Sequence, residues 1–366
     1  MSARLTRVTH IAHLAHLTRT AHLTRGARAV ALAGAIALTF GCSSGPEPRE
    51  AALVRGPSNA SPSPGSSGSP SAADDSPFWV DPVSPAARQA EQWREQGRAK
   101  DAALIERIAS QPVAVWPAGD DPAPKIRAAR EGTARDDRTA VLVAYNIPHR
   151  DCGQYSAGGA HSVDVYRRWL DTFAESIQDM KAIVILEPDA IPHSVDGCTP
   201  AQFHQERFQL LAEAIERLKE QPNTKVYLDA GNPDWIKNPG RLATPLRDSG
   251  IAKADGFALN VSNFQTDDAV RDYGHQLSAL LGGKHFVVDS SRNGNGPLPG
   301  ARTDAWCNPP GRALGKRPTA DTGDPLLDAY LWIKRPGESD GECRGGPRAG
   351  RWWPDYALGL ARNTRT

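Results

Sequence analysis

The most informative stretch of the chain is Ile183-Val184-Ile185-Leu186-Glu187-Pro188-Asp189-Ala190. A short apolar run bounded by charge predicts a buried strand, and Pro188 ends it because proline cannot donate a hydrogen bond to a sheet. Glu187 and Asp189 then lie where a parallel strand meets its loop, the end at which α/β barrels carry their chemistry. The alternative is a structural acid that binds loop amides. Repetition favours chemistry, because strand-like runs also precede Asp151, Asp229 and Asp340.

Strand-like and helix-like segments alternate along the rest of the chain. Residues 162–180 form a predicted helix, because an apolar side chain recurs every four residues from Val165 to Ile177. Residues 85–108 are also helical in pattern, whereas residues 120–136 are charged and loop-like. Thr199 followed by Pro200 starts a further predicted helix, with Thr199 as its N-cap, which runs to about residue 220.

The predicted strands lie at residues 113–116, 141–147, 183–186, 226–228, 256–261, 286–289 and 330–333. Strands that alternate with helices predict a parallel sheet, and about seven of them suggest a closed barrel. The chain has 366 residues, of which 39% are hydrophobic, and this is sufficient for one large α/β domain.

The charge of the chain is unevenly distributed. Residues 1–41 contain five arginines and no acidic residue, so without those five charges the net charge of +1 becomes −4. A nearly neutral, slightly acidic body argues against nucleic acid as a partner.

The first 76 residues are typical of an export signal and a tether. A basic, His-rich leader precedes the apolar run 29–40, which is too short to span a bilayer and matches the hydrophobic region of a signal peptide. Gly41-Cys42 followed by Ser43-Ser44-Gly45 resembles a bacterial lipoprotein processing site, which makes Cys42 a candidate for lipidation. The alternative is ordinary cleavage near Gly41 and secretion. We therefore expect a signal peptide at 1–41 and a Pro/Ser/Gly-rich tether at 42–76, whose composition cannot form a core.

Four cysteines follow the tether, at positions 152, 198, 307 and 343. An even number in an exported chain favours two disulfides over free buried thiols, and no ligand spacing predicts a zinc site. Counting leaves the connectivity open. Pairing Cys152 with Cys198 and Cys307 with Cys343 would brace the loops around the strand-end acids.

Several acids on one barrel rim suit glycoside hydrolysis. That reaction needs one protonated carboxyl group to donate to the leaving oxygen and a second carboxylate to activate water or attack the sugar. Trp116, Trp235 and Trp306 lie in loop-like stretches, where their rings would stack on sugars, although a core position is the alternative for each.

Two long motifs resemble the signatures of glycoside hydrolase family 6, which comprises inverting β-1,4-glucanases and cellobiohydrolases. They are Tyr145-Asn146-Ile147-Pro148-His149-Arg150-Asp151-Cys152-Gly153 and Ile185-Leu186-Glu187-Pro188-Asp189-Ala190-Ile191. Shorter matches are the segments 227–231, 259–264, 306–309 and 334–341. The resemblance covers residues 78–363 in the order of the family, and it is greatest to the family's actinobacterial endoglucanases.

The resemblance implies a role for each matched residue. Asp189 matches the catalytic acid, Asp151 the aspartate that raises the pKa of that acid, and Asp340 the proposed base. Asp229 matches a fourth active-site aspartate, and the disulfides of the family match the pairing 152–198 and 307–343. The implied substrate-binding residues are Tyr145, Trp116, Trp235, Trp306, Asn260, Asn263, Lys334 and Glu338.

One matched position departs from the family. Asn232 stands where the family usually has histidine after Asp-Ala-Gly, and asparagine can form hydrogen bonds but cannot titrate. The affinity of the sugar subsite at this position is therefore the property expected to differ most from that of the family. The loop after Asp340 is short, from Gly341 to about Gly350, which favours an open cleft over a tunnel.

Together these observations predict an exported, monomeric, inverting endo-β-1,4-glucanase without metal or organic cofactor. Its catalytic domain is expected at residues 77–366. The expected fold is a distorted seven-stranded parallel β/α barrel of the TIM type with an open substrate cleft. The partner is a β-glucan, and a membrane is contacted only through a lipid anchor. The alternatives are a glycan-binding lipoprotein without catalysis and a hydrolase of a different envelope β-glucan, the second of which Asn232 supports.

Overall fold

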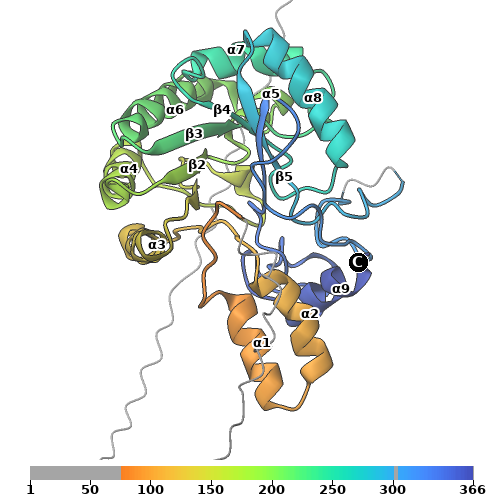
Figure 1. The fold of residues 1–366 in the computed structure, drawn as a ribbon. Coiled ribbons are helices and arrows are strands. Elements are labelled where there is room, and N and C mark those ends of the chain that lie inside the picture. Colours follow the sequence, from red (N-terminus) through yellow and green to blue (C-terminus); the bar gives the residue numbers. More distant parts are fainter. Residues whose placement is uncertain (1–75, 301–303, 366) are drawn as a thin grey trace, which may run out of the picture. The chain divides into compact units, whose positions relative to one another are not determined.

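The computed structural model describes residues 76–300 and 304–365 (Figure 1). The expected signal peptide, the candidate lipidation site Cys42 and residues 42–75 of the expected tether lie outside the described residues. Within them, no helix is of a length and hydrophobicity that would let it cross a membrane.

Six parallel strands form one sheet in which each strand pairs with its neighbour in the sequence. In chain order these are β1 (Ala140–Ala144), β2 (Ala182–Leu186), β3 (Thr224–Asp229), β4 (Gly256–Leu259), β5 (His285–Asp289) and β6 (Leu327–Leu331). This order brings the carboxyl ends of all six strands to one rim, as expected for the barrel type.

The prediction of a seventh strand at residues 113–116 is wrong. Val115 forms a single bridge with Leu142 of β1, and the N–H of Ala114 donates to the carbonyl of Trp332, just beyond β6. Pro112 and Pro117 flank this segment and cannot donate to a ladder, which keeps it from pairing over a longer range. A short bridging segment therefore lies between β1 and β6 where the sequence predicted a full strand.

Both faces of the sheet are buried. Leu142, Val184 and Leu186 belong to the large core cluster beneath the helices, while Val143 and Ile185 belong to the cluster inside the curled sheet. Burial on both sides explains why these strands are continuous apolar runs in the sequence.

The helices α4 (Val163–Ile177), α6 (His204–Lys219), α7 (Gly240–Asp248) and α8 (Asp267–Leu280) cover the outer face of the sheet (Figure 1). The helix expected at 162–180 is confirmed as α4: the hydroxyl of Ser162 accepts the N–H of Val165 as an N-cap, and the side chains of Trp169 and Phe173 are buried. The helices α1 (Pro85–Glu95) and α2 (Ala99–Ala109) pack with α9 (Pro354–Asn363) around a separate apolar cluster.

Two predictions between the strands need correction. Residues 123–136 form α3 (Ala123–Asp136), not a loop, because Ile126, Ala129 and Thr133 bury one face while the charged side chains lie on the other. The helix expected from Thr199 begins only at His204, after the short 3₁₀ helix η2 (Ala201–Phe203). Pro200 has an extended ψ of 138°, so it does not occupy the first helical position.

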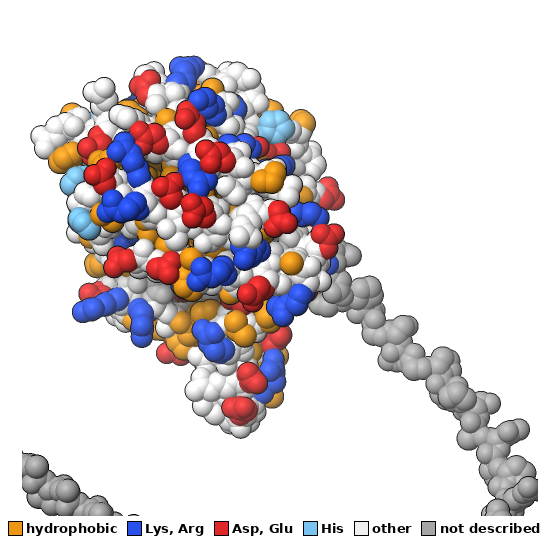
Figure 2. Space-filling model, turned by 90° about the vertical axis from the view of Figure 1, so that its left-hand side faces the viewer, with side chains coloured by type: hydrophobic (Ala, Val, Ile, Leu, Met, Phe, Trp, Pro, Cys, Tyr) orange, Lys and Arg blue, Asp and Glu red, His pale blue; other side chains and the backbone are white. Residues whose placement is uncertain are grey.

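The surface over α4 and its neighbours mixes charges of both signs. Figure 2 shows acidic and basic side chains interspersed on this face, without a large patch of one sign. Ion pairs join adjacent helices there, such as Arg167 with Glu213 and Arg217 with Asp171. This face is unlike the basic surface that nucleic acid requires.

Candidate active site

Unusual backbone conformations gather at the carboxyl ends of the strands. Glu187, Asp189 and Asn260 are non-glycine residues with positive φ values of 47°, 70° and 65°. Such conformations are costly, and they are typically retained where function requires a side chain to be aimed in a particular direction.

Asp189 follows Glu187 and Pro188 after the end of β2 and directly precedes α5 (Ala190–Asp196), a short helix that the sequence analysis missed. Its N–H donates to Oδ2 of Asp229 at 2.9 Å, and the hydroxyl of Tyr145 donates to its Oδ2 at 3.4 Å. Burial raises the pKa of Asp189 to about 6, and the nearby negative charge of Asp151 adds to this, while the charge of His193 opposes it.

Asp229 is the last residue of β3 and is almost fully buried. Burial raises its pKa well above the usual value, and the charge of Asp189 raises it further. The hydrogen bond that Asp229 accepts from the Asp189 backbone makes it a support for the acid.

Glu187 has the structural role that we considered for strand-end acids. It is fully buried, and its two carboxylate oxygens accept the backbone N–H groups of Asn146 and Ile147 at 2.9–3.0 Å. Burial raises its pKa to about 7, although these backbone hydrogen bonds oppose the shift. Glu187 thus joins the end of β2 to the segment after β1 that carries Tyr145.

Asp289 has a similar role on the other side of the sheet, and the sequence analysis missed it. Its carboxylate is fully buried at the end of β5. It accepts the backbone N–H groups of Ser262, Ser291, Ile333 and Lys334. The residues after β4, β5 and β6 are therefore held by one side chain.

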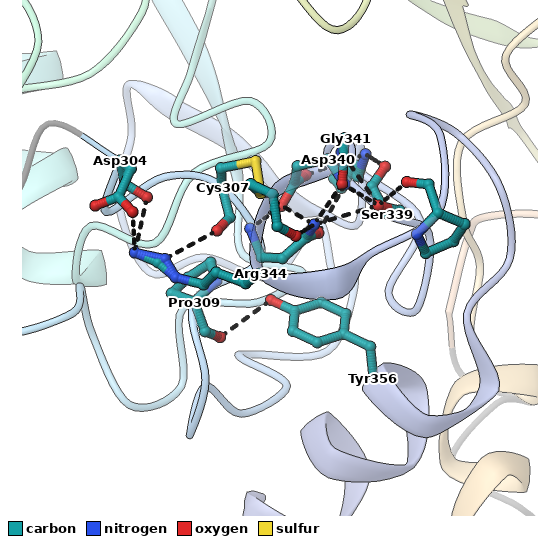
Figure 3. Close-up of a disulfide and its surroundings, with 12 residues drawn as sticks. Asp304, Cys307, Pro309, Ser339, Asp340, Gly341, Arg344 and Tyr356 are labelled. Atoms are coloured by element: carbon teal, nitrogen blue, oxygen red, sulfur yellow. Dashed lines mark hydrogen bonds and ion pairs between the residues drawn. A yellow bond between two sulfur atoms is a disulfide. The ribbon is translucent and has the colours of Figure 1, made fainter.

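Asp340 lies in a loop between the two cysteines of a disulfide and is buried (Figure 3). Nη1 of Arg292 donates to both of its carboxylate oxygens, at 2.9 and 2.8 Å, and Nζ of Lys334 lies 3.2 Å from Oδ1. The N–H of Asn308 donates to its Oδ2 at 3.0 Å. Burial opposes ionisation, but the charges of Arg292 and Lys334 outweigh it and lower the pKa of Asp340, so this carboxylate stays ionised.

The loop around Asp340 is itself braced. Arg344 pairs with Asp304 at 2.8 Å and donates to the carbonyl of Cys307, while the hydroxyl of Tyr356 in α9 points to the carbonyl of Pro309 (Figure 3). Arg292, the fully buried partner of Asp340, was not identified from the sequence. The only sequence feature that could have indicated a role for Arg292 is its position three residues after the end of the predicted strand 286–289.

His193 in α5 was also missed. It is buried one helical turn after Asp189, with Nε2 3.9 Å from Oδ1 of Asp151 and Nδ1 3.5 Å from Oδ2 of Asp196. Burial lowers its pKa, but the interactions with Asp151 and Asp196 outweigh burial and raise the pKa to about 9. Within the described residues, this ring belongs to two groups with metal-ligating atom types close together, one with Asp151 and Asp189 and one with the disulfide-bonded Cys152 and Cys198.

The three candidate sugar platforms are partly buried and their positions are fixed by neighbours. Nε1 of Trp116 donates to the carbonyl of Ile333, and its ring meets that of Tyr145 edge-on with centroids 5.6 Å apart. Nε1 of Trp235 donates to Asp196 at 2.8 Å. Trp306 lies beside Tyr155, with ring centroids 6.1 Å apart.

Other expected substrate-binding residues are bonded within the protein. Asn260 is fully buried and donates to the carbonyl oxygens of Asp289 and Gln265. The buried Asn232 accepts the N–H groups of Asp234 and Trp235, so it caps the turn that carries Trp235. Both side chains therefore form their hydrogen bonds with backbone groups of the protein.

Three further expected residues are arranged as follows. Glu338 is buried in an ion pair with Arg335 at 2.8 Å. The side-chain oxygen of the partly buried Asn263 accepts the N–H of Phe264 at 2.9 Å. Lys334 contacts Asp340, as described above.

The two disulfides are Cys152–Cys198 and Cys307–Cys343, the expected pairing. The first joins the 3₁₀ helix η1 (Asp151–Gly153) to the residues after α5, and the second joins Cys307 to the 3₁₀ helix η3 (Cys343–Gly345). Asp189 lies in the chain segment closed by the first disulfide, and Asp340 lies in the segment closed by the second.

Comparison with known proteins places these features in a family context. The model of the family described as "Glycosyl hydrolases family 6" matches residues 73–364. Endoglucanase A of Cellulomonas fimi is 43% identical over 295 residues, which are 79% of this chain and 61% of that protein. Endoglucanase 1 of Streptomyces halstedii is 40% identical over 76% of this chain and 87% of its own length.

A solved structure of an endoglucanase is also similar to this chain. The endoglucanase Cel6 from Mycobacterium tuberculosis, solved in complex with a thio-linked cellobioside, superposes with a TM-score of 0.72. It is 42% identical, and the match covers 79% of this chain and 97% of that one.

We expect Arg292→Met to lower the free energy of unfolding by about 3–5 kcal/mol, because it leaves Asp340 buried without its main partner. The matched control is Arg217→Met, which removes an arginine from the exposed ion pairs of α6 with Asp171 and Glu220. That change should cost about 0–1 kcal/mol. Urea unfolding followed by circular dichroism measures both, and equal losses in the two variants would contradict the structural importance of the buried pair.

Proposed function

Because the chain belongs to glycosyl hydrolases family 6, we propose that it hydrolyses internal β-1,4-glucosidic bonds of cellulose or a related β-glucan with inversion at the anomeric carbon. The observation that carries this proposal is the contrast between the surroundings of two carboxyl groups, Asp189 in the segment after β2 and Asp340 in the loop after β6. Asp189 has a raised pKa of about 6, and Asp340 has a lowered one. Glycoside hydrolysis requires one carboxyl group of each kind.

Asp189 is the proposed general acid. Burial keeps a proton on it under mildly acidic conditions, and this proton passes to the glycosidic oxygen as the bond to the leaving sugar breaks. Tyr145 stays protonated because burial and the charge of Asp189 raise its pKa, so its hydroxyl continues to donate to the acid. Asp151 acts through its charge, which favours the protonated form of Asp189.

Asp340 is the proposed base. Its carboxylate is ionised, but Arg292, Lys334 and Asn308 occupy both of its oxygens. Such a carboxylate is a weak base, and it accepts a proton only from a water that is already bonding to the anomeric carbon. The proton reaches it directly or through a second water.

Two alternatives remain open to experiment. A glycan-binding protein without catalysis would bind β-glucan but release no sugar, although all four proposed acids are present in this chain. A hydrolase of a different β-glucan is favoured by one observation: Asn232 caps a backbone turn, and it cannot carry the charge of a histidine.

We further propose that the protein acts as a monomer outside the cytoplasm. The basic leader, the apolar run at 29–40 and the polar stretch after Cys42 support export, with or without a lipid on Cys42.

The wild-type protein should release reducing sugar from a soluble β-1,4-glucan faster than from β-1,3- or β-1,6-glucans. Asp189→Asn should lower turnover of the β-1,4-glucan by at least about 10²–10⁴-fold, since the leaving oxygen is then not protonated. A substrate with a very good leaving group should be affected less. Asp164→Asn, in the first turn of α4, is the control and should retain activity. Near-normal turnover of the glucan by Asp189→Asn would refute the acid assignment.

Inversion predicts which anomer forms first. Proton NMR in the first minutes of cello-oligosaccharide hydrolysis should show the α-anomer at the new reducing end, followed by mutarotation. In inverting enzymes a water fits between base and sugar, and the two carboxyl groups stand roughly 6.5–9.5 Å apart. If the β-anomer appears first, the mechanism is retaining and Asp340 is not the base.

Cell fractionation tests the lipid anchor. If Cys42 is lipidated, Cys42→Ser should move the protein from the membrane fraction to the medium, because a lipid chain is needed to hold it at the bilayer. A wild-type protein that is already wholly in the medium would exclude the anchor while leaving export intact.

A further inference from the structure

We propose that His193 is a positioning residue that acts on the acid Asp189 through its charge and thereby sets the upper pH limit of hydrolysis. This inference rests on the proposed function, in which Asp189 must be protonated. It concerns a side chain that matched no motif in the sequence.

The position of His193 follows from α5. The helix begins directly after Asp189, and the N–H of His193 donates to the carbonyl of Asp189 at 2.9 Å, in its first turn. This places the ring on the same side as the acid. One oxygen each of Asp151 and Asp189 and one ring nitrogen of His193 lie within 4.8 Å of one another.

The ring is enclosed on several sides. Its side chain is only 7% exposed. Trp235 contacts it edge-on, with ring centroids 4.8 Å apart, and a sulfur atom of each cysteine in the Cys152–Cys198 disulfide lies within 4.8 Å of a ring nitrogen. Charges interact strongly in such a site because little water screens them.

The groups that face His193 are acidic. Asp151 approaches from η1, Asp189 from the position before α5, Asp196 from the end of α5, and Asp229 from the end of β3. Burial disfavours the charged ring, but Asp151 and Asp196 outweigh it and raise the pKa of His193 to about 9. The ring therefore remains a cation across the range in which Asp189, with a pKa of about 6, loses its proton.

The direction of the effect is determined by these charges. Burial and Asp151 hold the proton on Asp189, whereas a neighbouring cation favours the carboxylate. The enzyme needs the protonated acid, so kcat/KM falls as the pH rises through the pKa of Asp189 in the free enzyme. Removing the cation should raise that pKa and move the alkaline limb of the profile to higher pH. A histidine that only fills space would not move this limb.

The experiment compares pH profiles of kcat/KM on a soluble cello-oligosaccharide. His193→Gln keeps a polar side chain but removes the charge, and its alkaline limb should lie about 1–2 pH units above that of the wild type. His193→Lys keeps a positive charge and should restore the wild-type limb. His275→Gln is the matched control, because His275 in α8 also pairs with an aspartate, Asp324, at 2.7 Å but lies outside the proposed site. The pH profile of this variant should be unchanged.

A second measurement covers the case in which His193→Gln does not fold. NMR titration of the His193 ring in the wild-type protein should show a cation up to a pH of about 9. A ring that loses its proton below pH 7, or a folded His193→Gln variant with the wild-type limb, would overturn the inference. Either result leaves the proposed function standing if the wild type releases sugar, whereas a wild type that releases none refutes the function itself.

Discussion

The site depends on buried carboxyl groups that accept backbone N–H groups across neighbouring strand ends. Glu187 after β2 holds the residues after β1, Asp229 at the end of β3 holds the backbone of Asp189, and Asp289 at the end of β5 holds the residues after β4 and β6. A buried carboxyl group destabilises the fold unless its oxygens accept hydrogen bonds, so losing one of these backbone contacts would be costly. Together they fix the loops that carry the proposed acid and base with respect to the sheet.

The surroundings of two aspartates shift their pKa values in opposite directions. Asp189 is partly buried among other acids, so it binds its proton more tightly than a free aspartic acid does. Asp340 is more deeply buried, but Arg292 and Lys334 lie against it, and it stays ionised. Environments that push two carboxyl groups apart in pKa are what acid–base catalysis at a glycosidic bond requires. His193 moderates the first environment, because without a cation among those acids the proton would be held even more tightly.

Asn232 illustrates how a departure from a family motif can be absorbed. Its side chain caps the turn before Trp235, which donates in turn to Asp196, a partner of His193. Asn232 therefore holds the backbone of Trp235, the proposed sugar platform, with a side chain that does not titrate. The Cys152–Cys198 disulfide lies beside the same group, with both sulfur atoms within 4.8 Å of a ring nitrogen of His193.

Local sequence patterns were sufficient to predict the strands β1 to β6 and the helix α4, whose burial is continuous or periodic. They also located the acids at the strand ends. The helix α3 was missed, since its apolar stripe is narrow among many charges. The segment 113–116 has the apolar pattern of a strand, but it forms a single bridge because Pro112 and Pro117 flank it. Which acids are structural, and in which direction the pKa of each is shifted, depends on the tertiary structure. The partner of Asp340 is 48 residues away in Arg292, and Asn260 is turned into the protein by contacts with Asp289. A pKa or a role at the cleft depends on such distant neighbours and on burial, which no local pattern encodes.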